Sequence, residues 1–283
     1  MRDICFIDKT FDSTQTNNYH LSVQISPDGF FFTVLDIPKG KYIVLSGYNF
    51  FIKRPRLLLK HVKEVFEKEE LIKLEYQSVD ILYSTRLFTF VPKVLFSNDD
   101  AESFLSFNNL HEKGYTTRKN LFRRAESWCL YDVPQNLIEY LETVIPRAKV
   151  NHNLFPLIEG VLKNNRNFPE RQQVHLNFFR EYFEIAVVNG LKLIQCNIFN
   201  YKTERDILYY VLYVFDQLKL SPESTELIIQ GHLPQVSPVY HLLKKYVRKT
   251  NFAKLNNTYQ YSYTFSQMPE HYFSSLLSLY KCE

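Results

Sequence analysis

Residues 174–199 read VHLNFFREYFEIAVVNGLKLIQCNIF and carry the clearest fold signal in this chain. Three runs of strand-forming residues, 174–179, 182–188 and 191–199, are separated by Arg180-Glu181 and by Asn189-Gly190. Asn-Gly is the strongest short-range hairpin signal, because both residues tolerate positive φ. The pattern predicts a meander of three antiparallel strands.

A helix and a fourth strand are expected after the meander. Thr203 and Asp206 resemble a capping box, with Asp in place of the usual Glu or Gln. Residues 207–220 are apolar all round and predict a well-buried helix. The run Glu226-Leu-Ile-Ile-Gln230 predicts a short buried strand that ends at Gly231. The order is strand, strand, strand, helix, strand.

The first half of the chain has the same order of elements. Its four strand-like runs and one helix-like run occupy residues 20–26, 30–36, 41–46, 57–71 and 79–83. The residues of the two halves match poorly, but the element lengths agree, so we predict an internal duplication. Outside the repeats, we expect a loosely held arm at 1–18 and an irregular, basic excursion near 108–125. Tyr259, Tyr261, Tyr263 and Phe265 alternate, which predicts a strand in the tail.

Composition limits the class of protein. The 283 residues suit two domains, and an aromatic content of 16% is typical of packed cores. The net charge of +4 is too small to indicate nucleic-acid binding by itself. Four widely spaced cysteines favour reduced thiols, with Cys129 and Cys196 buried and inert. No apolar run reaches about 18 residues. We expect a soluble, cytoplasmic protein.

The duplicated order resembles the actin-like ATPase fold, which is α/β with mixed sheets and is built from two ribonuclease H-like domains. This implies a first such domain at 19–167, a second at 168–257, and a C-terminal strand and helix at 258–283 that dock on the body. The segments 90–96, 268–274 and 279–283 are similar to an uncharacterised bacterial family of Bacteroidetes, the DUF3822 family. The resemblance implies the fold and no activity.

The nucleotide site that the resemblance implies is degenerate in this chain. The first hairpin of the fold should carry an Asp near the end of its first strand and a glycine-rich turn. Here that turn reads Ser26-Pro27-Asp28-Gly29, and Pro27 lacks an N–H donor. The second hairpin, at Arg180-Glu181, has no glycine, and a single Gly231-His232 stands where paired glycines are expected. If ATP with Mg were retained, Ser26, Asp28, Gly29, Gly231 and His232 would bind it.

No other catalytic or metal motif is evident, and the histidines lack HxH or HxxxH spacing. His152 and His175 are expected to be packed or hydrogen-bonded core residues. Basic residues cluster at 53–56, at Arg118-Lys119 with Arg123-Arg124, and along a predicted amphipathic helix at 239–249. Solvated surfaces explain such clusters best, but the excursion around Arg118–Arg124 is the best candidate for a partner surface.

Three hypotheses follow. The leading one is a non-catalytic actin-like protein that acts as a binding or scaffold module, with another protein as its partner and no cofactor. The alternative is a divergent nucleotide-binding ATPase. The third is an RNA-associated factor that uses the basic loops, for which affinity should fall steeply with salt.

Overall fold

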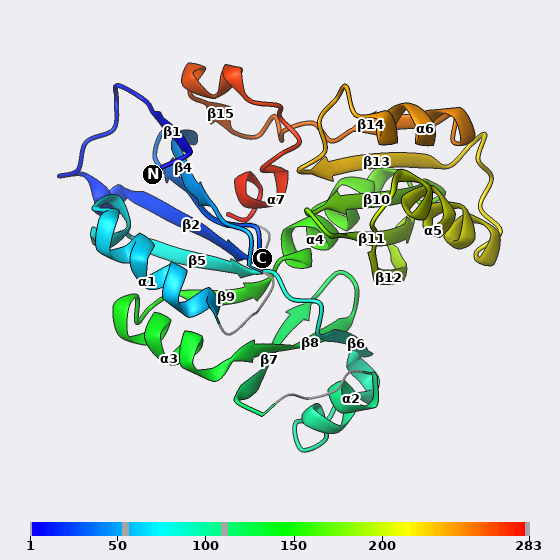
Figure 1. Ribbon diagram of the computed structural model, residues 1–283, viewed down its shortest axis with the longest axis horizontal. Coiled ribbons are helices and arrows are strands. Elements are labelled where there is room, and N and C mark those ends of the chain that lie inside the picture. The colour runs from blue at the N-terminus through cyan, green and yellow to red at the C-terminus, as the bar shows by residue number, and fades with distance from the viewer. Residues whose placement is uncertain (1, 53–56, 109–112, 281–283) are drawn as a thin grey trace. The chain divides into compact units, whose positions relative to one another are not determined.

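The computed structural model (Figure 1) describes residues 2–52, 57–108 and 113–280. The chain divides into two compact units. Unit 1 comprises Met1–Leu157, Asn256–Gln267 and Leu276–Glu283, and unit 2 comprises Ile158–Leu255 and Met268–Ser275. The tail that was expected to form one docked element at 258–283 therefore contributes to both units. None of the helices in the described residues is long and apolar enough to cross a membrane.

Unit 2 is built on a five-stranded sheet with the order β12-β11-β10-β13-β14. The predicted meander is confirmed as β10 (Gln172–Phe178), β11 (Tyr182–Asn189) and β12 (Lys192–Asn200). The predicted fourth strand is β13 (Glu226–Gly231), which lies parallel to β10. The fifth, β14 (Lys249–Phe252), lies parallel to β13 at the edge of the sheet.

Two helices pack against this sheet. α5 (Glu204–Gln217) begins at the predicted capping box, in which the Thr203 side chain accepts from the Asp206 N–H and the Asp206 carboxylate accepts from the Thr203 N–H. The expectation that α5 is buried all round is wrong, because only one stripe enters the core and the other side exposes Tyr209 and Tyr213. α6 (Pro238–Tyr246) packs beside it and ends before the predicted 249, because residues 249–252 form β14.

Unit 1 repeats the same order and confirms the duplication. The repeat consists of β2 (Tyr19–Ser26), β3 (Gly29–Asp36), β4 (Lys41–Asn49), α1 (Leu58–Lys68) and β5 (Ser78–Tyr83). β5 lies parallel to β2, as β13 lies parallel to β10. β9 (Lys149–His152) extends the sheet beside β5. Each unit therefore has three antiparallel strands, a helix and a fourth strand parallel to the first.

The expectation of a loosely held N-terminal arm is wrong, because part of this segment joins the sheet of unit 1. β1 (Ile4–Ile7) pairs antiparallel with β4, and the Arg2 guanidinium forms an ion pair with the buried Glu69 carboxylate. In the tail, only β15 (Gln260–Tyr261) pairs with β4, while Tyr263–Gln267 forms a 3-10 turn. The alternation of aromatic residues there was therefore not a strand signal beyond 261. α7 (Ser274–Leu277) follows.

The basic excursion also has regular structure. β6 (Phe88–Pro92), β7 (Tyr115–Phe122) and β8 (Ser127–Pro134) form a three-stranded antiparallel sheet with β8 in the centre. The expected loop at 115–122 is thus a strand, since pairing with β8 overrides the polar composition. The remaining helices of this region are α2 (Ala101–Asn108), α3 (Gln135–Val144) and α4 (Leu154–Asn164).

Candidate functional site

The hairpin turn of unit 1, where a phosphate-binding loop was considered, is closed by its own side chain. The Ser26 hydroxyl oxygen accepts hydrogen bonds from the backbone N–H groups of Asp28 and Gly29, each at 3.2 Å. A Cβ atom at Gly29 would lie 2.6 Å from the Tyr48 carbonyl oxygen, so close packing accounts for the glycine. The N–H groups that would have to face a phosphate are therefore already engaged inside the turn.

The turn that follows β13 in unit 2, Gly231-His232, is also closed. The Gly231 N–H donates to the His271 carbonyl and the His232 N–H donates to the Phe178 carbonyl, both at 2.9 Å. The His232 ring stacks on Tyr272, with 5.5 Å between ring centroids. Burial lowers the pKa of His232 to about 4, so its imidazole is neutral at pH 7 and offers no positive charge to a phosphate.

The hairpin between β10 and β11 holds Arg180-Glu181 in a tight turn. The Phe179 N–H donates to the Tyr182 carbonyl at 2.9 Å, and the two rings stack at 4.5 Å between centroids. A turn of this length has no row of N–H groups with which to surround a phosphate.

The two basic residues of β7, Arg118 and Lys119, contact different parts of the chain. Arg118 forms an ion pair with Glu142 of α3 at 2.5 Å. The Lys119 ammonium lies 5.3 Å from the ring centroids of both Phe96 and Trp128. Because adjacent residues of a strand point to opposite faces, Arg118 and Lys119 do not share one surface.

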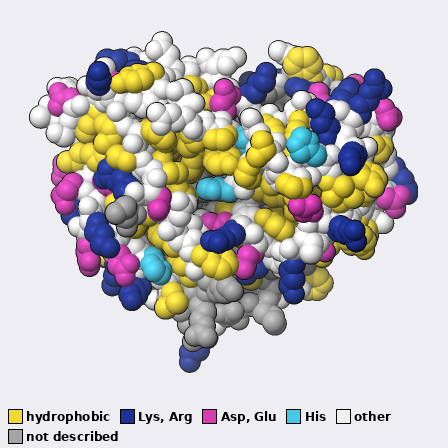
Figure 2. Space-filling view, turned by 45° about the horizontal axis from the view of Figure 1, so that its top comes forward, with side chains coloured by type: hydrophobic (Ala, Val, Ile, Leu, Met, Phe, Trp, Pro, Cys, Tyr) yellow, Lys and Arg dark blue, Asp and Glu magenta, His cyan; other side chains and the backbone are white. Residues whose placement is uncertain are grey.

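Arg123 and Arg124 lie beyond these residues, between β7 and β8. Figure 2 shows cationic and anionic side chains interspersed on the face that it presents. The cluster at 53–56 lies outside the described residues. The structure therefore does not gather the predicted basic residues of β7 into one patch.

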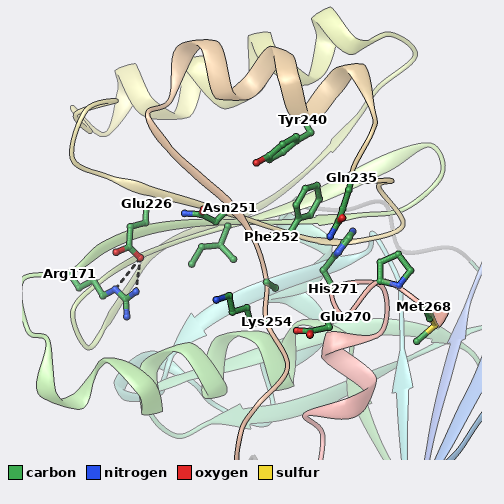
Figure 3. Close-up of a pocket in the computed structure, with 13 residues that line it drawn as sticks. Arg171, Glu226, Gln235, Tyr240, Asn251, Phe252, Lys254, Met268, Glu270 and His271 are labelled. Carbon is green, nitrogen blue, oxygen red and sulfur yellow. Dashed lines mark hydrogen bonds and ion pairs between the residues drawn. The ribbon is translucent and has the colours of Figure 1, made fainter. Parts of the chain in front are cut away.

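An open groove in unit 2 was not predicted from the sequence. It has a volume of about 890 Å³ and runs along the edge strand β14 (Figure 3). Tyr240 contributes from α6, Asn251 and Phe252 from β14, and Glu270 and His271 from the C-terminal segment. We call this the β14 groove. Periodicity cannot reveal a strand of only four residues, so the first residue of β14 was predicted to be the end of a helix.

The backbone of β14 is oriented for pairing with a further strand. The Ala253 N–H, directly after β14, donates to the Ile229 carbonyl of β13 at 2.8 Å. Because backbone groups alternate between the two edges of a strand, the N–H and C=O groups of Thr250 and Phe252 point away from β13; Thr250 is buried, and Phe252 is partly exposed. No strand in the described chain pairs with β14 on that side.

The side chains around this edge form an aromatic floor. The Phe252 ring lies 4.6 Å from the Tyr240 ring and 4.2 Å from the His271 ring, measured between centroids. The His271 Nε2 is held by the Leu233 carbonyl at 2.8 Å, which orients the imidazole. The floor is therefore preformed.

One ion pair lies at the end of the groove. Arg171 donates two hydrogen bonds to one Glu226 carboxylate oxygen, at 2.7 and 3.1 Å, and Gln173 donates a third at 3.0 Å. Burial opposes ionisation of Glu226, but these hydrogen bonds prevail and lower its pKa. The Glu226 carboxylate is therefore ionised and matched by Arg171.

The other charges lie in the groove and beside it. Lys249 and Lys254 are exposed beside it, and the Lys244 ammonium lies 5.6 Å from the centroid of the Tyr240 ring. Glu270 is the one other carboxylate among the described residues that line the groove. The charges that line the groove therefore balance, with Arg171 and Lys254 against Glu226 and Glu270, while Lys244 and Lys249 add positive charge next to it.

The histidines and cysteines of the described residues do not cluster. No group of three or more His, Cys, Asp or Glu residues in the described parts of the chain could hold a metal ion. Cys129 is buried, as expected, whereas Cys196, also expected to be buried, is only partly buried. Desolvation by its surroundings nevertheless raises the pKa of the Cys196 thiol well above its ordinary value. Cys196 is therefore a poor nucleophile at neutral pH.

Comparisons with known proteins support the fold. A crystal structure from Bacteroides thetaiotaomicron VPI-5482, described as a protein with an actin-like ATPase fold and unknown function, is similar with a TM-score of 0.77 and 22% identity, over 86% of this chain and 94% of that one. A structure of the PilM-PilN type IV pilus biogenesis complex is similar with a TM-score of 0.60 and 11% identity, over 93% of this chain and 98% of that one. No curated protein matches the sequence.

The family is established by sequence. A family model described as "Protein of unknown function (DUF3822)" matches residues 8–250, which is most of the chain. This match confirms the predicted family, and it includes the segment 90–96, whereas the segments 268–274 and 279–283 lie outside the matched residues. The chain is a member of the DUF3822 family, and it has the actin-like ATPase fold.

Proposed function

We propose that this protein is a non-catalytic binding module that holds an extended, acidic segment of another protein in the β14 groove. One observation carries the proposal: an edge strand with outward-facing backbone groups borders an open cavity with a preformed aromatic floor. An added strand gains affinity from main-chain hydrogen bonds and specificity from pockets for its alternate side chains.

The chemistry of the groove indicates which segment fits. Tyr240 and Phe252 offer an apolar surface to one side chain of an added strand. Lys244, Lys249 and Lys254 favour a segment with acidic residues, since charge complementarity steers association and selects partners. A basic segment would meet like charges at the rim.

Two further observations support a binding role without nucleotide chemistry. The N–H groups of both fold-typical turns are engaged within the chain, at Ser26 and at the His271 and Phe178 carbonyls. A structure of the same fold is found in the PilM-PilN complex, so this fold can serve in a protein–protein assembly.

The binding site is tested by selecting short peptides from a random displayed library on the immobilised full chain, with depletion on a Lys254→Glu variant in each round. We expect enriched sequences that alternate apolar and polar residues and contain acidic side chains. Lys254→Glu should weaken a selected peptide about fivefold or more. A matched Lys163→Glu variant, at an exposed position of α4, should leave the affinity unchanged.

Methylation of alternate backbone amides of the selected peptide provides the second readout. Methylation at amides that donate to β14 should abolish binding, while methylation at the intervening amides should not, because only one set faces the strand. If neither Lys254→Glu nor the pattern of methylation changes the affinity, the β14 groove is not the binding site.

The non-catalytic part is tested separately by thermal denaturation with Mg-ATP. A ligand present at a hundredfold its dissociation constant stabilises a protein by about 2.7 kcal/mol. We expect no shift. A clear shift that is lost in Asp28→Ala would instead assign nucleotide binding to the Ser26–Gly29 turn.

A further inference from the structure

The exposed side of α5 carries an aromatic stripe with opposite charges at its two ends. Tyr209 is 63% exposed and Tyr213 is 46% exposed, and their rings stack at 6.2 Å between centroids. Arg205 lies one turn before Tyr209, and Asp216 lies one turn after Tyr213; both are exposed. Since residues three or four apart share one side of a helix, these four residues form a single line, which we call the α5 stripe.

The α5 stripe packs on aromatic residues beneath it. Tyr209 contacts Tyr210 at 5.3 Å, and Tyr210 stacks on Phe199 of β12 at 4.4 Å, both measured between ring centroids. On the opposite side of the helix, the buried residues join the core of unit 2: Ile207, Val211, Val214 and Phe215. Exposed aromatic side chains on a rigid helix are typical of interaction surfaces.

The order of residues in the α5 stripe makes it complementary to itself. If two α5 helices pack antiparallel about a two-fold axis, the axis that places Tyr209 opposite Tyr213 of the second helix lies at position 211. The axis that places Arg205 opposite Asp216 lies between positions 210 and 211. The two positions differ by half a residue, about 0.75 Å along a helix. One two-fold axis therefore brings both rings and both charge pairs into contact.

We infer that the α5 stripe is the contact surface for a second copy of this chain, in a symmetric dimer with antiparallel α5 helices. A two-fold interface uses the same patch on both subunits, so the patch must complement itself, and this one does in the spacing of its rings and of its charges. The ion pair that Asp216 makes with Lys219, at 3.3 Å, does not compete strongly, because both side chains are largely exposed. The patch is small, so the dimer is a weak, concentration-dependent one.

The test is sedimentation equilibrium of the full chain, with charge variants of the two ends. The wild type should self-associate. Arg205→Asp places two carboxylates opposite each other at both ends of the interface, and Asp216→Arg places two guanidinium groups there. Each variant alone should dimerise about tenfold more weakly or worse. Neither change opposes folding, because an anion near the helix N-terminus and a cation near its C-terminus both suit the helix dipole.

Mixing the two variants gives the decisive result. At one end of the mixed pair, the carboxylate introduced at position 205 of one chain would face the guanidinium introduced at position 216 of the other. The opposite end would keep the native pairing of Asp216 with Arg205, so a heterodimer with wild-type strength should form. The double variant, Arg205→Asp with Asp216→Arg, should also regain self-association. Tyr209→Ala with Tyr213→Ala should abolish the association that the native charges support.

Two results would overturn the inference. One is a wild type that sediments as a monomer up to near-millimolar concentration. The other is a mixture of the two charge variants that associates no more strongly than each variant alone. Neither result bears on the β14 groove, because that site lies on other elements of unit 2.

Discussion

His175 provides a prediction in which stability is linked to pH. It lies in the middle of β10 and is only 5% exposed, and neither ring nitrogen has a hydrogen-bond partner among the described residues. Burial, and next the nearby Arg171 charge, lower the pKa of His175 to about 4, although Glu226 opposes this. Below its ordinary pKa of about 6.5, a histidine in the unfolded chain binds a proton that the folded chain does not take up.

The sign and size of the effect follow from this difference. The unfolded state binds more protons than the folded state between about pH 6.5 and pH 4, so stability falls as the pH falls through that window. For a pKa that moves from about 6.5 to about 4, the free energy of unfolding drops by about 2 kcal/mol between pH 7 and pH 5, and by about 3 kcal/mol in full. Leucine, of similar size, cannot titrate.

Between pH 7 and pH 5, we therefore expect the free energy of unfolding of His175→Leu to fall by about 2 kcal/mol less than that of the wild type. At pH 7 the variant should already be more stable by about 1 kcal/mol or more, because a buried polar group without a partner has been removed. Urea denaturation by circular dichroism at both pH values measures the free energies. Hydrogen exchange of the β10–β11 peptides assigns the change to unit 2, whereas Trp128 fluorescence reports on unit 1.

The control is His241→Leu, which removes an exposed imidazole from α6. Other buried histidines remain in the His175→Leu variant, so it will still lose some stability in acid, and the comparison with the wild type is what counts. Equal losses of stability in His175→Leu and wild type between pH 7 and pH 5 would show that the His175 imidazole does not carry the pH dependence.

Three substitutions, two of them with a matched control variant, test local geometry by thermal or urea denaturation. Thr203→Ala removes the N-cap of α5 and should lower the free energy of unfolding by about 1 kcal/mol, whereas Thr203→Ser should leave it nearly unchanged. If both variants lose the same stability, the Thr203 side chain does not act as an N-cap. Gly231→Ala should cost about 2 kcal/mol or more, because φ is +81° and the new Cβ would lie 2.4 Å from the Phe178 carbonyl oxygen. The matched Gly160→Ala, in a helix with open space, should stabilise by about 0.5–1 kcal/mol. Ser26→Ala should cost about 1–2 kcal/mol, since two N–H groups lose their acceptor, and an unchanged stability would show that water replaces it fully.

Much of the fold could be predicted from local signals. Asn189-Gly190 correctly places the hairpin before β12, although the turn residues are Gly190 and Leu191, because Asn189 still pairs with Lys192, and only Gly190 has positive φ. The Thr203–Asp206 capping box begins α5, as predicted. These signals succeed because they depend on backbone conformation within a few residues. The duplication could be predicted for the same reason, since each half contains its own turns and periodic runs.

The errors have a common physical cause. β7 was expected to be a loop and β1 part of a loosely held arm, yet both gain their structure by pairing with the distant strands β8 and β4. The exposed side of α5 was expected to be buried, because apolar composition does not show that a helix has only one covered face. In each case the deciding partner lies far away in the sequence.

For the candidate sites, too, local signals predicted some features and distant contacts decided the others. The residues alone indicate that the turns at 26–29, 180–181 and 231–232, where the resemblance implies phosphate-binding loops, are poor in glycine, and that the chain repeats one unit of strands and a helix. Tertiary contacts were needed to learn that Ser26 and the carbonyls of Phe178 and His271 occupy the N–H groups of those turns. They were also needed to place β14 at an open edge beside Tyr240 and His271. A site of this kind is assembled from segments far apart in the chain, and no local pattern encodes which of them meet.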